Sequence, residues 1–120
     1  NFNNSSSSTL LFIVKSDEGF ILTDLINFPN PFTNFTSITA GHNRPDEELE
    51  ITVAIYSYGG EKIRIIKTTI PSSGYSIPPV IWDGTTEKGG RAARGLYIYS
   101  VTVRTRNGET ASSSGRMVIL

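Results

Sequence analysis

Apolar and polar residues alternate most regularly in two stretches of the chain. In residues 49–56 the odd positions are Leu, Ile, Val and Ile, while the polar Glu50 and Thr52 lie on the other side. In residues 96–104 the odd positions from 97 to 103 are Tyr, Tyr, Val and Val. A period of two is typical of a β-strand with one face in the core and the other in water. We therefore predict a strand in each stretch.

Shorter apolar runs, separated by Gly, Pro, Asn and Asp, predict further strands. The Gly59-Gly60 and Asn107-Gly108 pairs are typical of tight turns between antiparallel strands. No apolar stripe with helical spacing persists for ten residues. The pattern thus predicts an all-β fold, an immunoglobulin-like antiparallel β-sandwich of seven or eight strands. The other predicted strands are Leu10–Val14, Phe20–Leu22 with Leu25–Ile26, Thr36–Ala40, Lys62–Ile65, Val80–Trp82 and Met117–Leu120.

Two local features refine this prediction. The doubled isoleucine at 65–66 interrupts the alternation of its strand, so we expect a β-bulge there. Trp82 and Tyr97 are the large aromatic residues that we expect to anchor the core.

The chain divides into three regions. With 120 residues it has the length of one domain. Residues 1–8 are polar and of low complexity, which predicts a flexible linker following another part of the native protein. Residues 9–26 predict N-terminal strands that either extend the sandwich or swap with a neighbour, and residues 27–120 form the sandwich domain. No apolar run reaches the roughly 20 residues of a membrane-spanning helix, so we expect no direct membrane span.

The composition restricts the possible chemistry. The sequence has no cysteine and a single histidine. A disulfide, a thiolate metal site and a cysteine nucleophile are therefore excluded, and a histidine-based triad is hard to build. We expect no catalytic residue, no metal and no cofactor in this chain.

The charges balance overall but not along the chain. Eleven basic and eleven acidic residues give a formal net charge of zero, so we expect no nucleic-acid partner. Residues 1–61 hold two basic and eight acidic residues, whereas residues 62–120 hold nine basic and three acidic ones. Either the charges of both halves interleave across paired strands, or the surface has acidic and basic faces that steer a partner.

Two groups of polar residues are weak candidates for calcium sites. The acidic residues between 46 and 50 offer carboxylate oxygens, but their spacing is not that of an EF-hand, and a solvated loop explains them as well. Residues 83–87 also offer oxygens, although a turn in which Asp83 bonds its own backbone two residues on is the simpler interpretation.

The remaining candidates are a histidine and a group of aromatic residues. His42 is a lone histidine in a predicted loop, where a ligand or base role is the less common one. Tyrosines beside arginines either stack on a sugar or nucleic acid or pack half-buried against the fold. They are Tyr56, Tyr58, Tyr97 and Tyr99, with Arg104 and Arg106.

Taken in order, five motifs resemble the C-terminal sorting domains of the bacterial type IX secretion system. Each motif is weak, but the ordered set covers residues 27–120 and is specific. The sequence departs from the family pattern at two places. Thr86 stands where the family usually has an aspartate, and Ala93-Arg94 before Gly95 is the second departure. The motifs are NFPNPF at 27–32, the strand 36–40, VAIYSYGGE at 53–61, WDG at 82–84 with Gly89 and GLYIY at 95–99, and RMVIL at 116–120.

A narrower resemblance is to the sorting-type domain at the end of the system's own sortase, a gingipain-like cysteine endopeptidase. Residues 42–46, 77–84 and 118–120 carry it. The resemblance implies a signal and docking domain, read by the outer-membrane translocation and attachment machinery at the bacterial cell surface after passage through the periplasm. It implies an outer-membrane β-barrel protein and translocon components as partners, and catalytic residues in an upstream domain. We expect the isolated domain to be a monomer.

The resemblance also implies site residues. The last strand is the expected docking element because an edge strand offers free N–H and C=O groups, although Met117 and Ile119 could instead only close the core. The expected docking residues are Gly115, Arg116, Met117, Val118, Ile119 and Leu120, and the structural motif is Pro29, Asn30, Pro31, Phe32, Trp82, Asp83, Gly84, Gly95 and Tyr97.

Two other functions fit a small sandwich. One is a carbohydrate-binding module on an extracellular enzyme, which would use surface tyrosines and an exposed Trp82. The other is a structural spacer. The sorting-domain interpretation instead predicts that Trp82 is buried.

Overall fold

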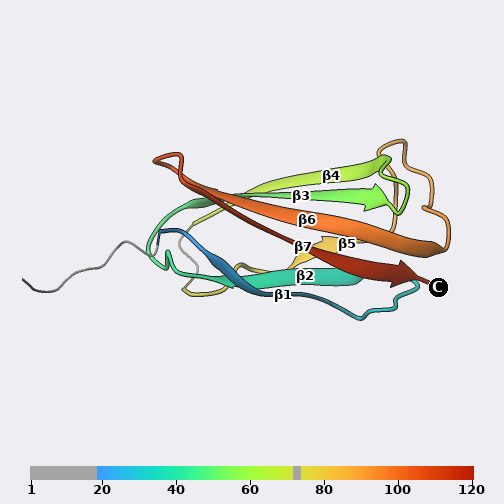
Figure 1. Cartoon of the computed structure of the whole chain (residues 1–120), viewed down its shortest axis with the longest axis horizontal. Helices are drawn as coiled ribbons and strands as arrows, with labels where there is room; N and C mark the ends of the chain where they lie inside the picture. The colour runs from blue at the N-terminus through green and yellow to red at the C-terminus, as the bar shows by residue number, and fades with distance from the viewer. Residues whose placement is uncertain (1–18, 72–73) are drawn as a thin grey trace, which may run out of the picture.

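The protein is a sandwich of two antiparallel β-sheets (Figure 1). The computed structural model describes residues 19–71 and 74–120. Within these residues, one sheet has the strand order β1-β2-β5 and the other the order β4-β3-β6-β7. This confirms the predicted fold class. The strands are β1 (Leu22–Phe28), β2 (Thr36–His42), β3 (Leu49–Ser57), β4 (Lys62–Ile70), β5 (Val80–Trp82), β6 (Gly95–Thr105) and β7 (Thr110–Ile119).

The core lies between the two sheets and is built by the alternating strands. The odd residues of β3 from 49 to 55 and those of β6 from 97 to 103 are all buried, as their pattern predicts. From the opposite sheet Ile38, Val80 and Trp82 face them. Burial of about ten large apolar side chains, each contributing about 1.5–3 kcal/mol, is the main stabilising term.

The first strand departs from regular geometry. Asp24 has a φ of +54°, and the register of β1 on β2 shifts between Thr23 and Ile26. This irregularity explains why the apolar pattern of the segment is interrupted. β1 begins at Leu22 rather than Phe20 and continues to Phe28, past the predicted end at Ile26.

The predicted bulge in β4 is at the wrong place. Ile65 and Ile66 pair in regular register with Ala54 and Val53, and the shift occurs instead around Ile63, between the pairs Ile55–Arg64 and Tyr56–Lys62. The doubled isoleucine has another cause: β4 is an edge strand, and both of its faces are partly covered.

Part of the sequence-based interpretation concerns residues that the structure does not describe. The linker at residues 1–8 and the strand at Leu10–Val14 lie outside the described residues. In residues 19–71 and 74–120, no helix is long and apolar enough to cross a membrane.

Candidate docking surface

The Asn-Pro-Phe motif lies against the C-terminal strand. Asn30 Nδ2 donates to the carbonyl oxygen of Arg116 at 3.1 Å, and its Oδ1 accepts from the N–H of Val118 at 3.1 Å. The Phe32 N–H donates to the Val118 carbonyl at 3.0 Å, and the Leu120 N–H donates to the Phe32 carbonyl at 2.9 Å. Phe32 thereby forms a parallel bridge with Ile119. After β1, the chain thus crosses to the other sheet, where residues 30–32 cover the outer edge of the last residues of β7.

The two prolines of the motif shape this crossing. Cis peptide bonds precede both Pro29 and Pro31. The Pro29 carbonyl accepts a hydrogen bond from Thr36 Oγ1 at 2.8 Å, at the start of β2. The same hydroxyl accepts from the buried Asn27 amide at 3.1 Å. Pro29 is therefore tied to β2 while Asn30 is tied to β7.

The predicted docking residues divide between the core and the surface. Met117 and Ile119 are buried in the core, so they close the sandwich. Arg116 and Leu120 are exposed and Val118 is half-buried, because alternate residues of β7 face outward. Gly115 lies against Tyr99. A Cβ at position 115 would stand 2.8 Å from the hydroxyl oxygen of Tyr99.

Within residues 19–71 and 74–120, the outer edge of β7 is hydrogen-bonded only over its second half. β7 is the last strand of its sheet, next to β6. Alternate residues of a strand direct their backbone groups to the same edge. Since Val118 faces the Asn30–Phe32 segment, Ser112 and Ser114 point to that edge as well, and there no described strand pairs with them. The open stretch, Thr110–Ser114, contains neither charge nor proline, the usual protections of an edge strand.

The outward side chains of β7 continue an apolar surface on β6. Leu96 is opposite Val118, and Ile98 is opposite Arg116 in the register of the two strands. Directly opposed residues lie on the same face of a sheet. We call Leu96, Ile98, Arg116, Val118 and Leu120 the C-terminal patch. The sequence motif included its β7 residues but gave no signal that Leu96 and Ile98 lie beside them.

The aromatic residues of the motif form one cluster in the core. Trp82 is fully buried, and its ring packs edge-on against Phe32 at 5.8 Å and Tyr97 at 6.0 Å between centroids. The Tyr97 hydroxyl donates to the Ala93 carbonyl at 2.6 Å, and burial raises the pKa of this hydroxyl. Trp82 Nε1 donates to the Thr85 carbonyl at 2.9 Å. The cluster ties Phe32 to both sheets.

Asp83, Gly84 and Gly95 are turn residues. Asp83 Oδ1 accepts from the Thr85 N–H at 3.1 Å and from its hydroxyl at 2.6 Å, and these bonds lower the pKa of the Asp83 carboxyl. This is the predicted turn. Gly84 has a φ of +81°, and a Cβ there would stand 2.8 Å from the Arg91 guanidinium. Gly95, with a φ of +144°, begins β6.

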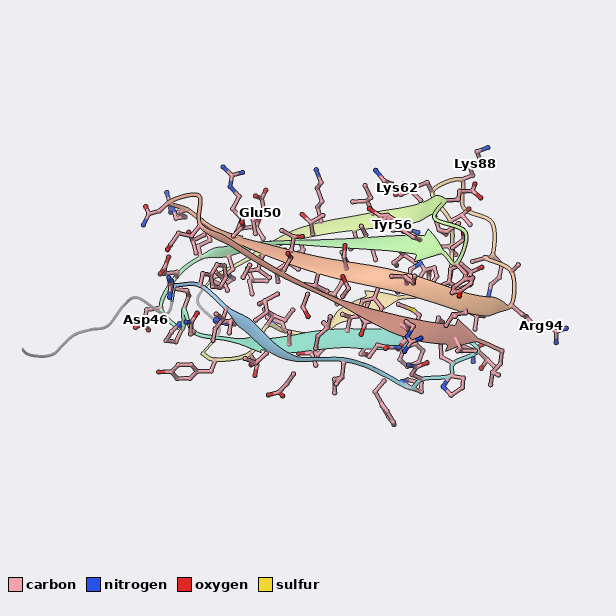
Figure 2. The ribbon with its side chains drawn as sticks, in the orientation of Figure 1. Asp46, Glu50, Tyr56, Lys62, Lys88 and Arg94 are labelled. Carbon is pink, nitrogen blue, oxygen red and sulfur yellow. The ribbon has the colours of Figure 1, made fainter. Side chains whose placement is uncertain are left out.

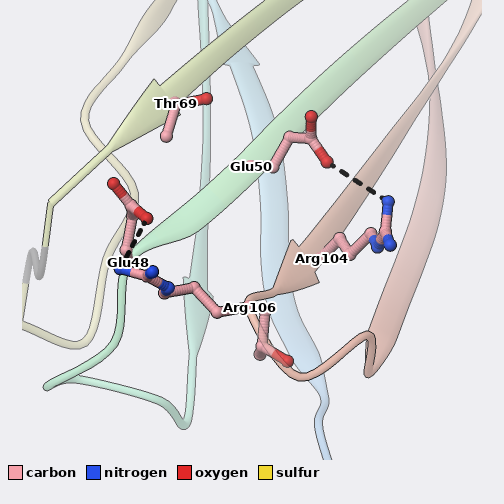
Figure 3. Close-up of a pocket in the computed structure, with 6 residues that line it drawn as sticks. Glu48, Glu50, Thr69, Arg104 and Arg106 are labelled. Atoms are coloured by element: carbon pink, nitrogen blue, oxygen red, sulfur yellow. Dashed lines mark ion pairs between the residues drawn. The ribbon is translucent and has the colours of Figure 1, made fainter.

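Charges from the two halves of the sequence meet in a shallow surface depression of about 220 Å³ (Figure 3). Glu50 pairs with Arg104 at 3.7 Å, and Glu48 pairs with Arg106 at 3.5 Å. The acidic cluster is thus balanced by arginines of β6 and its loop. The depression is smaller than the roughly 300–1,000 Å³ of typical ligand sites.

Charge also differs between the ends of the sandwich. Asp46 lies at one end of the long axis, while Lys88 and Arg94 lie at the other (Figure 2). Charges of the two halves of the sequence nevertheless pair both along β3 and β6, as Glu50 with Arg104, and in the loops, as Glu48 with Arg106. In the described residues, no three His, Asp or Glu side chains gather to hold a metal ion.

His42 and the tyrosines have structural roles. His42 ends β2 and is buried, its Nδ1 accepts from the Arg44 N–H at 3.0 Å, and burial lowers its pKa. Tyr97 and Tyr99 are in the core, whereas Tyr58 is exposed. The tyrosines therefore do not form one stacking platform.

Two solved structures with a similar fold match this chain. The crystal structure of dimeric latent PorU from Porphyromonas gingivalis matches with a TM-score of 0.76 and 27% sequence identity, over 92% of this chain and 10% of that chain. A β-glucuronidase from Bacteroides uniformis matches with a TM-score of 0.53 and 17% identity, over 85% of this chain and 13% of that chain. The second match shows the fold alone.

The present chain thus spans about one tenth of PorU. No protein-family model matches the sequence, and no curated protein matches it. The PorU match covers 92% of this chain and agrees with the resemblance expected from the sequence motifs. The chain is a small immunoglobulin-like β-sandwich similar to the C-terminal part of PorU.

Proposed function

We propose that this sandwich is the C-terminal signal and docking domain of a type IX secretion system protein, one of the sortase type. The observation that carries the proposal is the similarity to PorU over 92% of the chain. The motif residues support it, because Asn30 and Phe32 hold the last strand in place rather than lying scattered over the surface. In this proposal the catalytic residues belong to another part of the parent protein.

The proposed partner is an outer-membrane β-barrel protein of the translocation and attachment machinery. The domain would bind this partner at the cell surface. The C-terminal patch is the docking surface that fits this role. It joins an exposed apolar side chain, Leu120 at 60% exposure, to the exposed cation Arg116. An apolar centre beside an arginine is a common composition for the energetically important part of a protein interface.

The structure decides which variants test this proposal. Removing residues 115–120 would take Met117 and Ile119 out of the core, so loss of binding would report unfolding. Leu120→Asp and Arg116→Glu change only exposed side chains of the patch. Ser112→Asp, on the same strand and face but outside the patch, is the matched control.

The experiment captures proteins from an outer-membrane extract of a bacterium that has the type IX system. We expect the unmodified chain and Ser112→Asp to retain the same β-barrel protein, identified by mass spectrometry. Leu120→Asp combined with Arg116→Glu should reduce its capture by at least about tenfold. Capture of no component of the system by the folded chain would contradict the function. Equal capture by all variants would contradict only the assigned surface.

A further inference from the structure

The two ends of the sandwich differ in how their charged side chains are partnered. Towards the end that holds Asp46, three arginines form ion pairs with glutamates at N–O distances between 3.2 and 3.7 Å. The positive charge of this end is thus neutralised within the chain. The pairs are Arg44 with Glu47 and with Glu109, Arg104 with Glu50, and Arg106 with Glu48.

The opposite end carries exposed cations without such partners. We call Lys62, Lys88, Arg91 and Arg94 the basic end. None of these four side chains forms an ion pair with another described residue. Arg91 donates hydrogen bonds to the carbonyl oxygens of Asn34 and Asp83, but a carbonyl leaves the charge of the guanidinium uncompensated.

The carboxylates beside these cations are largely engaged by the backbone. Glu87 Oε2 accepts from the Ile65 N–H at 2.6 Å, and Asp83 Oδ1 accepts from the Thr85 N–H at 3.1 Å. The two segments of this end, 61–65 and 83–94, hold five basic and three acidic residues. The segments of the opposite end, 43–50 and 104–109, hold three basic and five acidic residues. One end is therefore positive by two charges and the other negative by two.

The cations of the basic end lie on segments that are tied together. The Glu87 N–H donates to the Ile63 carbonyl at 3.0 Å, and Lys62 and Lys88 line the same shallow depression of about 210 Å³. Gly95 is opposite Ile119 in the register of β6 and β7, so Arg94 and the exposed Leu120 follow at neighbouring places. The end thus combines unpaired cations with an exposed apolar side chain.

The separation of the two charged ends is large compared with electrostatic screening. β6 begins at Gly95, at the basic end, and finishes at Thr105, at the acidic end. Its 11 residues span roughly 35 Å, whereas the Debye length at physiological salt is about 8 Å. An anionic surface that touches the basic end therefore attracts its cations without feeling the acidic end, although the net charge of the chain is zero.

The composition of the basic end favours a lipid surface over an acidic protein. Lysine is depleted at protein–protein interfaces, and two of the four cations are lysines. An anionic lipid surface needs no matched pocket, and each Lys or Arg close to it strengthens binding by about fivefold. Cations beside an exposed apolar side chain are also typical of proteins that lie on a membrane surface.

We propose that the basic end is a contact surface for an anionic lipid membrane. Its four cations meet the phosphate headgroups, and Leu120 lies at the boundary between headgroups and acyl chains. The contact orients the long axis of the sandwich away from the membrane, because the acidic end is repelled. The inference is independent of the proposed function, and the four cations lie outside the C-terminal patch.

The test measures co-sedimentation of the full chain with vesicles. One set contains equal parts of phosphatidylglycerol and phosphatidylcholine, and the other contains phosphatidylcholine alone. Lys88→Glu combined with Arg94→Glu reverses two cations of the basic end. Lys67→Glu combined with Arg106→Glu makes the same change of net charge at exposed positions outside this end and is the matched control. Circular dichroism shows that each variant is folded.

We expect the unmodified chain to bind the phosphatidylglycerol vesicles at least about tenfold more strongly than the neutral ones. This binding should disappear at about 1 M salt, where the Debye length is about 3 Å. The Lys88 and Arg94 variant should lose at least about tenfold of the binding, and the control should stay within about twofold. Equal binding to both vesicle types, no binding to either, or equal losses in the two variants would overturn the proposal. Soluble polyglutamate that binds the chain as strongly as the anionic vesicles would assign the basic end to an acidic protein and overturn it as well.

Discussion

Asn30 accepts a hydrogen bond from the backbone N–H of Val118, 88 positions later in the sequence. The same side chain donates to the Arg116 carbonyl. One side-chain amide thus makes two of the hydrogen bonds that a neighbouring strand would otherwise make to the outer edge of β7. This pair of hydrogen bonds gives the second asparagine of the NFPNPF motif, Asn30, a physical role. It ties the segment after β1 to the strand that carries the proposed docking surface.

Replacing Asn30 should loosen the C-terminal strand. In Asn30→Ala the Val118 N–H loses its acceptor, and we expect about 1–2 kcal/mol of lost stability. Deuterium exchange of the Val118 amide should become at least about tenfold faster, measured by NMR. Asn34→Ala is the matched control, since Asn34 accepts a hydrogen bond from Arg91 through its backbone carbonyl, which alanine keeps. Equal exchange in both variants would contradict the role of Asn30.

Gly115 should tolerate no side chain. A Cβ at this position would stand 2.8 Å from Tyr99 Oη, and the buried Tyr99 ring cannot move away freely. Gly115→Ala should therefore lower the free energy of unfolding by about 1–3 kcal/mol in a urea titration. Ser114→Ala, one residue earlier and exposed, should change it by less than about 0.5 kcal/mol. An unchanged midpoint for Gly115→Ala would show that the two strands separate more easily than the structure indicates.

Acidification should destabilise the fold through His42. Burial lowers the pKa of His42 below its ordinary value, so the unfolded chain binds this proton first as the pH falls. Its contribution to stability is complete above about pH 6.5 and decreases as the pH falls towards the lower pKa of the folded state. The slope should not exceed about 1.4 kcal/mol per pH unit. Denaturant titrations at several pH values should show this decrease, and His42→Gln should remove it.

A sugar-binding module and a sorting domain differ in what Trp82 should do. Trp82 is fully buried, so its fluorescence should resist a soluble quencher and should not change when glycans are titrated. The exposed aromatic residues, such as Phe28 at 73% and Tyr58 at 71%, lie on different strands or loops. A saturable change of Trp82 fluorescence with a glycan would favour the carbohydrate-binding alternative.

The sequence predicted the parts of the fold that follow from regular patterns. Alternation located β3 and β6, and the Asn107-Gly108 pair located the turn between β6 and β7. Both signals are local in the sequence. The irregularity of β1 at Asp24 and the true position of the β4 bulge depend on pairing with other strands, which a linear pattern does not contain.

The candidate site was predictable only in part, for a similar reason. The motif named Arg116, Val118 and Leu120 among the expected docking residues, and it left open that Met117 and Ile119 only close the core. That Asn30 clamps this strand, and that Leu96 and Ile98 share its face, depends on contacts between residues far apart in the sequence. The pairing of the exposed charges of Glu50 and Arg104 likewise depends on the register of β3 on β6.

The most direct test of the account is delivery of a reporter to the cell surface. A periplasmically exported reporter is fused to the full chain in a bacterium that has the type IX system, and in the same strain with that system inactivated. We expect protease-accessible reporter at the surface only with the intact system, and a loss of at least about tenfold when Leu120→Asp and Arg116→Glu are combined. Reporter that remains in the periplasm equally in both strains, although the domain is folded, would contradict the account.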